Sequence, residues 1–148
     1  AGGAAKCRLA LEHGAEFAID YKSENFVERV KAITGGQGVK VVYDSVGKDT
    51  FDGSLDCLRP FGLMCCFGNA SGAVPPFPPG SLYLTRQTLF THIATREATQ
   101  AMADDLFGVV GSGLVKIRID QRYPLAEAAQ AHRDLEARKT TGSTILLP

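Results

Sequence analysis

The pattern of apolar and polar positions predicts strands and helices that alternate along the first half of the chain. Three short apolar runs are typical of strands: residues 17–21, 39–43 and 63–67. Helical apolar spacing predicts helices over 6–13, from 26 to 33, and from 51 to 58, with Pro60 and Gly62 stopping the last one. Asn25, and Asp49 or Thr50, stand where helix N-caps are expected. This order predicts an α/β fold with a parallel sheet.

The central stretch, Val39 to Gly72, predicts a strand, a helix and a second strand. Each strand ends in a polar loop, Ser45–Gly47 after the first and Gly68–Gly72 after the second. Parallel α/β sheets bind ligands beyond the carboxyl ends of their strands, because the loops there converge. The sequence therefore predicts that both loops face a ligand.

The second half of the chain begins with a break. Four prolines between residues 73 and 80 predict an extended surface loop. Beyond it we expect strands over 81–85, 115–119 and 143–147, a helix from the Thr95 cap to about Val110, and a helix following Pro124. Core packing is expected for Met102, Leu106 and a stripe of Leu125, Ala128, Ala129, His132 and Leu135.

The charge balance and hydropathy narrow the range of partners. The 148 residues are 45% hydrophobic and 22% charged, with 16 basic and 16 acidic residues. A chain with no net charge gives no reason to expect nucleic acid or an anionic membrane as the main partner. No apolar run approaches the roughly 20 residues of a membrane span. We expect one soluble, cytoplasmic domain.

The cysteines and histidines do not predict a metal site. Cys7, Cys57, Cys65 and Cys66 lack C-x-x-C spacing, and adjacent residues of a strand point to opposite faces of its sheet. The three histidines are far apart in the sequence. The cysteines are interpreted as small buried hydrophobic residues in a reducing compartment.

Several long runs together resemble one enzyme family. They are VVYDSVGKDTF (41–51), SLDCLRPFGLM (54–64), FGNASG (67–72), GSLYLTR (80–86) and AQAHRDLEARKTTGSTILLP (129–148). The chain is similar to the cofactor-domain and C-terminal part of NADPH-dependent quinone oxidoreductases, the zeta-crystallin-like branch of the medium-chain dehydrogenase/reductase superfamily.

The resemblance implies an enzyme of about twice this length with an N-terminal GroES-like catalytic domain, a Rossmann domain for NADPH, a homodimeric assembly and no zinc. No G-x-G-x-x-G is present, and the first two strands of the Rossmann sheet are expected to be absent from this chain. They would lie between 17–21 and 39–43. Residues 1–122 are interpreted as a partial Rossmann domain and 123–148 as a helix and strand returning to the catalytic domain.

The resemblance also implies cofactor-binding residues. Lys6, Tyr21 and Arg138 would surround the 2′-phosphate, which suits a lysine charge, a phenol donor and a forked guanidinium. The segment that selects NADP over NAD would include Gly2 and Gly3 and has no acidic residue. Two loops would line the rest of the cofactor: Ser45, Val46 and Gly47 at the adenosine, and Phe67, Gly68, Asn69, Ala70, Ser71 and Gly72 at the nicotinamide.

No catalytic acid or base is assigned. The expected reaction is hydride transfer from NADPH to a quinone, which takes its proton from water, so cofactor positioning carries the catalysis. The alternatives are an enoyl or other α,β-unsaturated carbonyl reductase on the same scaffold, and a non-catalytic NADPH-binding or RNA-binding relative. The chain lacks interleaved basic and aromatic residues, which argues against RNA. Taken alone, the chain is expected to be inactive.

Overall fold

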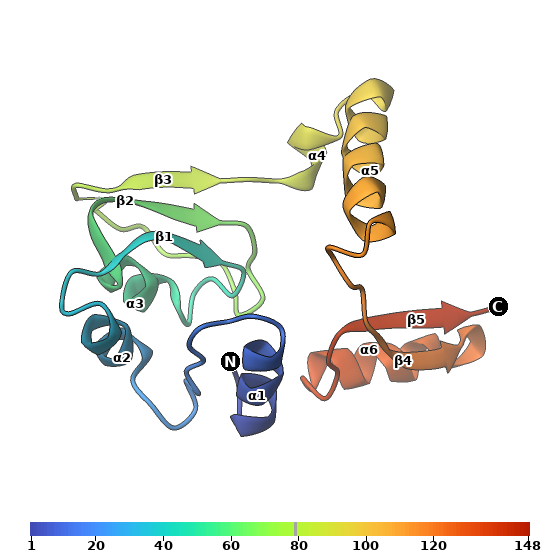
Figure 1. Cartoon of the computed structure of the whole chain (residues 1–148), viewed down its shortest axis with the longest axis horizontal. Coiled ribbons are helices and arrows are strands. Elements are labelled where there is room, and N and C mark those ends of the chain that lie inside the picture. The colour runs from blue at the N-terminus through green and yellow to red at the C-terminus, as the bar shows by residue number, and fades with distance from the viewer. Residues whose placement is uncertain (79) are drawn as a thin grey trace. The chain divides into compact units, whose positions relative to one another are not determined.

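The computed structural model describes residues 1–78 and 80–148, which form two compact units, Ala1–Thr91 and His92–Pro148 (Figure 1). Each unit has its own parallel strands. The sequence-based division at residues 122 and 123 concerns the domains of the intact protein and stays a prediction.

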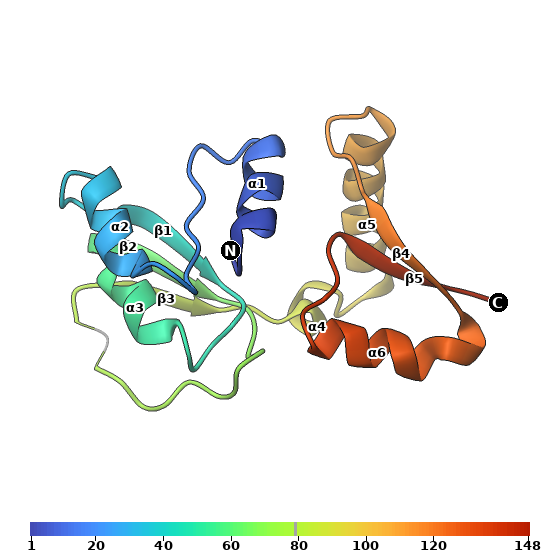
Figure 2. The same ribbon diagram turned by 90° about the horizontal axis from the view of Figure 1, so that it is seen from below.

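The first unit is built on a three-stranded parallel sheet in the order β1-β2-β3. The strands are β1 (Val39–Asp44), β2 (Leu58–Cys66) and β3 (Tyr83–Arg86). Tyr43 is in register with Cys65, and Cys65 with Thr85, so the three carboxyl ends lie together at one end of the sheet (Figures 1 and 2). The predicted strand–helix–strand unit and the third strand are confirmed.

The described residues of this unit also form α1 (Ala4–Glu12), α2 (Phe26–Ile33) and α3 (Phe51–Asp56). Asn25 caps α2 as predicted, because its side-chain oxygen accepts hydrogen bonds from the N–H groups of Val27 and Glu28. Gly14 follows α1 with a φ of 93°, the left-handed conformation typical of a helix stop. A short helix, α4 (Leu89–His92), spans the boundary between the units.

The core of the first unit lies between α3 and one face of the sheet. Phe51 of α3 contacts Met64 and Cys66 of β2, and all three are at most 2% exposed. The ring of Phe77 packs edge-on against Phe51, with centroids 4.6 Å apart. The opposite face is open: Tyr43 is 74% exposed. The apolar run of β1 is therefore covered on one face only, the face on which α3 lies (Figure 1).

The strand predicted at residues 17–21 does not form. Residues 17–20 have no regular structure, although the amino group of Ala1 donates to the carbonyl of Ile19 at 2.6 Å and Tyr21 N–H donates to the carbonyl of Ala1. A strand needs a ladder of hydrogen bonds to a neighbouring chain segment. A single residue cannot supply one, so the apolar pattern alone was insufficient.

The boundary between the central helix and its second strand also differs from the prediction. The helix ends at Asp56, and β2 begins at Leu58 and contains Pro60 and Gly62, which were predicted to stop the helix. Val39 N–H donates to the Cys57 carbonyl, which fixes the start of the pairing. Tertiary pairing to β1 thus overrides the helical spacing of Leu58, whose side chain still packs on the core.

The second unit contains α5 (Arg96–Gly111) and a strand–helix–strand unit. That unit consists of β4 (Ile119–Pro124), a 3-10 turn (Leu125–Glu127), α6 (Ala128–Glu136) and β5 (Ser143–Leu147), with β4 and β5 parallel. Thr95 caps α5 as predicted, and β5 is confirmed. The strand predicted at 115–119 is displaced to β4, because β5 pairs with residues 119–124 and so determines which residues form the ladder.

Burial in the second unit corrects the predicted core positions. Met102 and Leu106 are 45% and 49% exposed, and α5 has no buried residue. In α6 the buried residue is Ala131, whereas the predicted stripe members Leu125 and Leu135 are more than half exposed. Helical spacing identifies an apolar face, but a packing partner is needed to bury it.

The proline-rich loop and the search for a membrane-spanning helix concern the described residues only. The predicted proline-rich loop, 73–80, has no helix or strand at 73–78, and Pro79 lies outside the described residues. Within the described ranges, no helix combines the length and the apolar character that crossing a membrane requires.

Candidate functional site

A buried carboxylate organises the loop that follows β1. Asp44, the last residue of β1, is 4% exposed. Its Oδ1 accepts hydrogen bonds from the backbone N–H groups of Val46 and Gly47 at 2.8 and 2.9 Å. The first of these bonds closes an Asx turn, the local structure that aspartate favours. The buried Asp44 carboxylate therefore fixes the backbone of the predicted ligand-facing loop, Ser45–Gly47.

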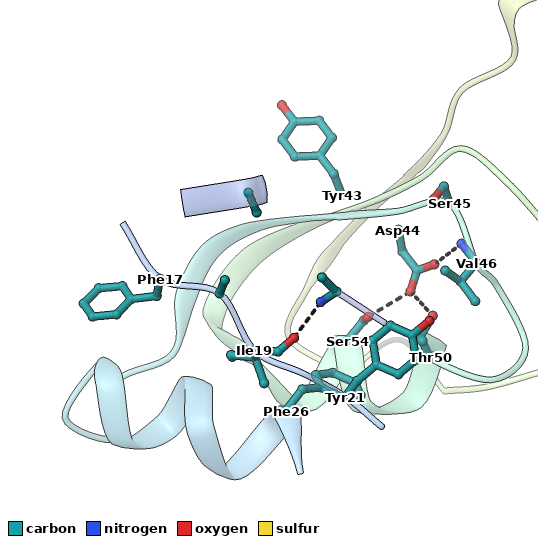
Figure 3. Close-up of a pocket in the computed structure, with 13 residues that line it drawn as sticks. Phe17, Ile19, Tyr21, Phe26, Tyr43, Asp44, Ser45, Val46, Thr50 and Ser54 are labelled. Atoms are coloured by element: carbon teal, nitrogen blue, oxygen red, sulfur yellow. Dashed lines mark hydrogen bonds between the residues drawn. The ribbon is translucent and has the colours of Figure 1, made fainter. Parts of the chain in front are cut away.

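The other carboxylate oxygen ties β1 to α3. Asp44 Oδ2 accepts from Thr50 Oγ1 at 2.7 Å and from Ser54 Oγ at 2.8 Å (Figure 3). Thr50 is the N-cap residue of α3, but its hydroxyl binds Asp44 and makes no cap hydrogen bond to the helix. The predicted cap position is confirmed, while the cap's usual hydrogen bond is replaced by one to the strand end.

These contacts determine the charge state of Asp44. Burial alone would raise the pKa of the carboxyl, because it disfavours the charged form. The hydrogen bonds from Gly47, Thr50, Ser54 and Val46 favour the carboxylate and together lower the pKa below its ordinary value. Asp44 is therefore an anion at neutral pH.

The second predicted loop is joined to the first by backbone hydrogen bonds. Phe67 N–H donates to the Asp44 carbonyl at 2.9 Å, and Ser71 N–H donates to the Val46 carbonyl at 2.8 Å. Ser71 Oγ donates to the same carbonyl at 2.8 Å and accepts from Asp49 N–H at 3.0 Å. We call residues 45–50 and 67–72 the paired loops. Ser45, Val46 and all six predicted residues of the second loop thus lie in one assembly.

Two glycines allow this close approach. A Cβ at Gly68 would collide with the Ser45 carbonyl oxygen, and a Cβ at Gly47 would lie 2.7 Å from the Gly72 carbonyl oxygen. Gly47 also has a φ of 87°, which disfavours other residues. Both contacts are with backbone atoms, so a side chain at either position would force the loops apart.

A cleft of about 400 Å³ opens beside the paired loops (Figure 3). One side is formed by Asp44, Ser45 and Val46 at the end of β1, and the other by the irregular segment that contains Phe17, Ile19 and Tyr21. The remaining lining residues are Ala1, Ala10, Ala18, Phe26, Tyr43, Thr50 and Ser54. Polar groups at a strand end and apolar walls beyond it are typical of a small-molecule site.

A second cleft, of about 520 Å³, borders the other paired loop. Asn69 lines it together with the apolar side chains of Phe77 and Leu84. Arg86, at the carboxyl end of β3, supplies a cation and donates from Nη1 to the Cys66 sulfur at 3.5 Å. The remaining lining residues are Phe51, Cys66, Ala73, Val74, Pro75 and Pro76. Each paired loop therefore borders its own cleft.

The predicted phosphate-binding residues fall in two places. Gly2 lies against Tyr21, since a Cβ at Gly2 would be 2.7 Å from the tyrosine oxygen, and Gly3 N–H donates to Asp20 Oδ1 at 2.9 Å. Lys6 lies in the first turn of α1. Arg138 belongs to the second unit and follows Ala137, the C-cap residue of α6, with a φ of 57°. Gly2, Gly3 and Tyr21 therefore lie together in the first unit, whereas Arg138 lies in the second.

Sequence reasoning missed the residues that support the paired loops. Asp44, Thr50 and Ser54 were not among the predicted site residues, although they hold the first loop in place. An acidic residue that ends a strand and precedes small residues is a signal for an Asx turn. The hydroxyls at positions 50 and 54 gave no such local signal, because their contact with Asp44 depends on the packing of α3 against β1.

Parallel strands, crossing helices and loops paired at the strand ends define a Rossmann-type α/β protein, and the predicted fold class is confirmed. The chain belongs to the family described as zinc-binding dehydrogenase, whose model matches residues 13–146. The family resemblance seen in the sequence is likewise confirmed.

Two bacterial proteins and one bacterial crystal structure illustrate what the chain is similar to. The chain is 54% identical to a quinone oxidoreductase of Pseudomonas aeruginosa, over 97% of this chain and 46% of that protein. It is 41% identical to a 2-haloacrylate reductase of a Burkholderia species, over 97% of this chain and 45% of that protein. The solved structure of Escherichia coli quinone oxidoreductase complexed with NADPH superposes with a TM-score of 0.93 at 48% identity, covering 99% of this chain and 48% of that one. The chain spans about half the length of these relatives.

The family description mentions zinc, so we tested whether the residues present could hold it. Within residues 1–78 and 80–148, no three His, Cys, Asp or Glu side chains are grouped closely enough to bind a metal ion. The described residues therefore do not fit a zinc centre. The expectation that the intact protein works without zinc stays a prediction.

Proposed function

We propose that this chain is the cofactor-binding half of an NADPH-dependent oxidoreductase that reduces quinones. The observation that carries the proposal is the likeness to a quinone oxidoreductase solved with NADPH, at a TM-score of 0.93 over 99% of this chain. The paired loops support it, because they occupy the carboxyl ends of parallel strands, where Rossmann-type proteins bind dinucleotides.

The residues fit the two ends of such a cofactor. Ser45 and Val46 border the first cleft and would face the adenosine, whereas Asn69 borders the second and would bond the nicotinamide end through its amide. Lys6, Tyr21 and Arg138 would hold the 2′-phosphate. When bound, NADPH supplies the hydride. The protein's part is to orient the cofactor so that the acceptor can approach it, and no acid or base of this chain is assigned to proton transfer.

The decisive experiment uses the intact protein and a panel of quinones and enones, with oxidation of NADPH followed by absorbance. We expect turnover with quinones and a preference for NADPH over NADH. Absence of turnover with every quinone would refute the proposed substrate class. This chain without its remaining part is expected to be inactive.

A second candidate function is reduction of an α,β-unsaturated acid or carbonyl compound. The 2-haloacrylate reductase of Burkholderia, 41% identical to this chain, favours it. Hydride transfer to a conjugated double bond needs the same orientation of the nicotinamide, so the paired loops would serve either substrate. Turnover of 2-haloacrylates that exceeds turnover of quinones in the same panel would favour this second function.

We further propose a zinc-independent, cytoplasmic homodimer. The family resemblance supports the dimer, and the lack of a metal-binding group among the described residues supports activity without zinc. Sedimentation of the intact protein tests the dimer, and activity after exhaustive chelation tests the independence from zinc. The balanced charge of the chain offers no support for an RNA-binding role.

A further inference from the structure

The carboxylate of Asp44 is almost fully enclosed, although the residue lines the first cleft. The residue is 4% exposed, and its two oxygens already accept four hydrogen bonds. Two come from the backbone of the first paired loop and two from hydroxyls at α3. We therefore expect Asp44 to act on a bound ligand mainly through the groups that it holds.

The same connection continues into the second paired loop. The N–H of Val46 donates to Asp44, and the carbonyl of Val46 accepts hydrogen bonds from both the N–H and the hydroxyl of Ser71. The Ser71 hydroxyl in turn accepts from Asp49 N–H. A single side chain thus bridges two points of the first loop, and a continuous path of hydrogen bonds runs from the carboxylate to residue 71.

We propose that Asp44 and Ser71 are positioning residues that lock the paired loops into one cofactor-binding surface. The proposal rests on the proposed function for the identity of the ligand. Asp44 fixes the loop assigned to the adenosine, and Ser71 transmits that position to the loop assigned to the nicotinamide. Loss of Ser71 is therefore expected to affect the nicotinamide end, whereas loss of Asp44 affects both ends.

The first experiment needs no cofactor. Amide hydrogen exchange of the intact protein is measured by NMR for wild type, Asp44→Ala, Asp44→Asn and Asp52→Ala. In Asp44→Ala we expect exchange at Phe67 and Ser71 to be about tenfold faster or more, the size of a lost hydrogen bond to a charged group. Asn retains an oxygen for the two loop N–H groups, so Asp44→Asn should stay closer to wild type.

Asp52→Ala is the matched control, because it removes an exposed carboxylate from the same helix. It should leave exchange at Phe67 and Ser71 unchanged. Unaltered exchange at these amides in Asp44→Ala would overturn the proposal, and so would equal acceleration in the control.

The second experiment compares two ligands by calorimetry. Ser71→Ala loses both hydroxyl contacts but keeps its N–H bond to Val46, which favours a folded variant. We expect its Kd for NADPH to rise about three- to tenfold, the effect of losing one or two neutral hydrogen bonds. Its Kd for 2′,5′-ADP, which lacks the nicotinamide, should stay within about twofold of wild type.

The outcomes separate this proposal from the proposed function. Equal weakening of both ligands in Ser71→Ala, or no weakening of NADPH, would overturn the role of Ser71. If wild type bound neither ligand, the proposed function would fail, while the exchange experiment would still decide whether Asp44 and Ser71 hold the loops together. If Asp44→Ala failed to fold, the comparison of the two ligands in Ser71→Ala would carry the test.

Discussion

Ser54 Oγ donates a 2.8 Å hydrogen bond to Asp44 Oδ2, and both residues are buried. This contact joins the last residue of β1 to α3, ten positions further along the chain. It completes the set of donors around a carboxylate that already holds the loop after β1. Stability and the geometry of the candidate site therefore depend on the same side chain.

Asp44 predicts a specific acid sensitivity. Its pKa is lower in the folded chain than in the unfolded chain, so the carboxylate contributes stability above the unfolded pKa and loses that contribution as the pH falls through the folded pKa. We expect the free energy of unfolding of wild type to decline below about pH 5, and Asp44→Asn to show a shallower decline. Urea unfolding at several pH values measures both.

The control for this prediction is Asp52→Asn, which removes an exposed carboxylate from the first turn of α3. At pH 7 its free energy of unfolding should stay within about 0.5 kcal/mol of that of wild type. At pH 7 we expect Asp44→Asn to cost about 1–3 kcal/mol, the range for hydrogen bonds to a charged group. Parallel profiles of wild type and Asp44→Asn would contradict the assignment.

The preference for NADPH is expected to depend on charges near the 2′-phosphate. Lys6→Ala combined with Arg138→Ala should weaken binding of NADPH by about tenfold or more, because charge-assisted hydrogen bonds are lost, and should change binding of NADH far less. Calorimetry on the intact protein measures both affinities. The control combines Lys40→Ala with Arg59→Ala, which also removes one lysine and one arginine charge, near the amino-terminal ends of β1 and β2. It should change the affinity for neither cofactor. Equal losses for both cofactors would contradict the phosphate assignment.

Gly68 is expected to be intolerant of a side chain. Gly68→Ala places a Cβ in collision with the Ser45 carbonyl oxygen, so the paired loops must separate. We expect a loss of about 1–3 kcal/mol in the free energy of unfolding, together with weaker binding of NADPH. Gly108→Ala is a matched control inside α5, where a Cβ would meet no described atom within 4 Å. It should stabilise the chain by up to about 1 kcal/mol. Thermal unfolding that ranks the two variants in the opposite order would refute this interpretation.

The core between β2 and α3 predicts the largest loss of stability. Met64 is fully buried against Phe51. Met64→Ala should lower the free energy of unfolding by about 2–5 kcal/mol, because it leaves a cavity. Leu114, 82% exposed after α5, provides the control; Leu114→Ala should change stability by no more than about 0.5 kcal/mol. Denaturant unfolding measures both, and similar losses would show that the core lies elsewhere.

Local signals in the sequence were sufficient for several elements. Asn25 and Thr95 cap the helices that they were predicted to begin, since a cap satisfies only N–H groups two or three residues away. The two polar loops at the ends of β1 and β2 were likewise predicted, because a glycine-containing polar stretch after an apolar run ends a strand locally. Such features need no distant partner.

The sequence by itself determined the parallel α/β pattern, the family, and the two loops that end neighbouring strands. The tertiary structure decided which apolar runs became strands, because a ladder needs a partner: residues 17–20 remain irregular, while pairing with β5 moved the expected strand at 115–119 to β4. It also decided that Asp44 links the paired loops to α3. Thr50 and Ser54 reach that carboxylate only because the helix packs against the end of β1.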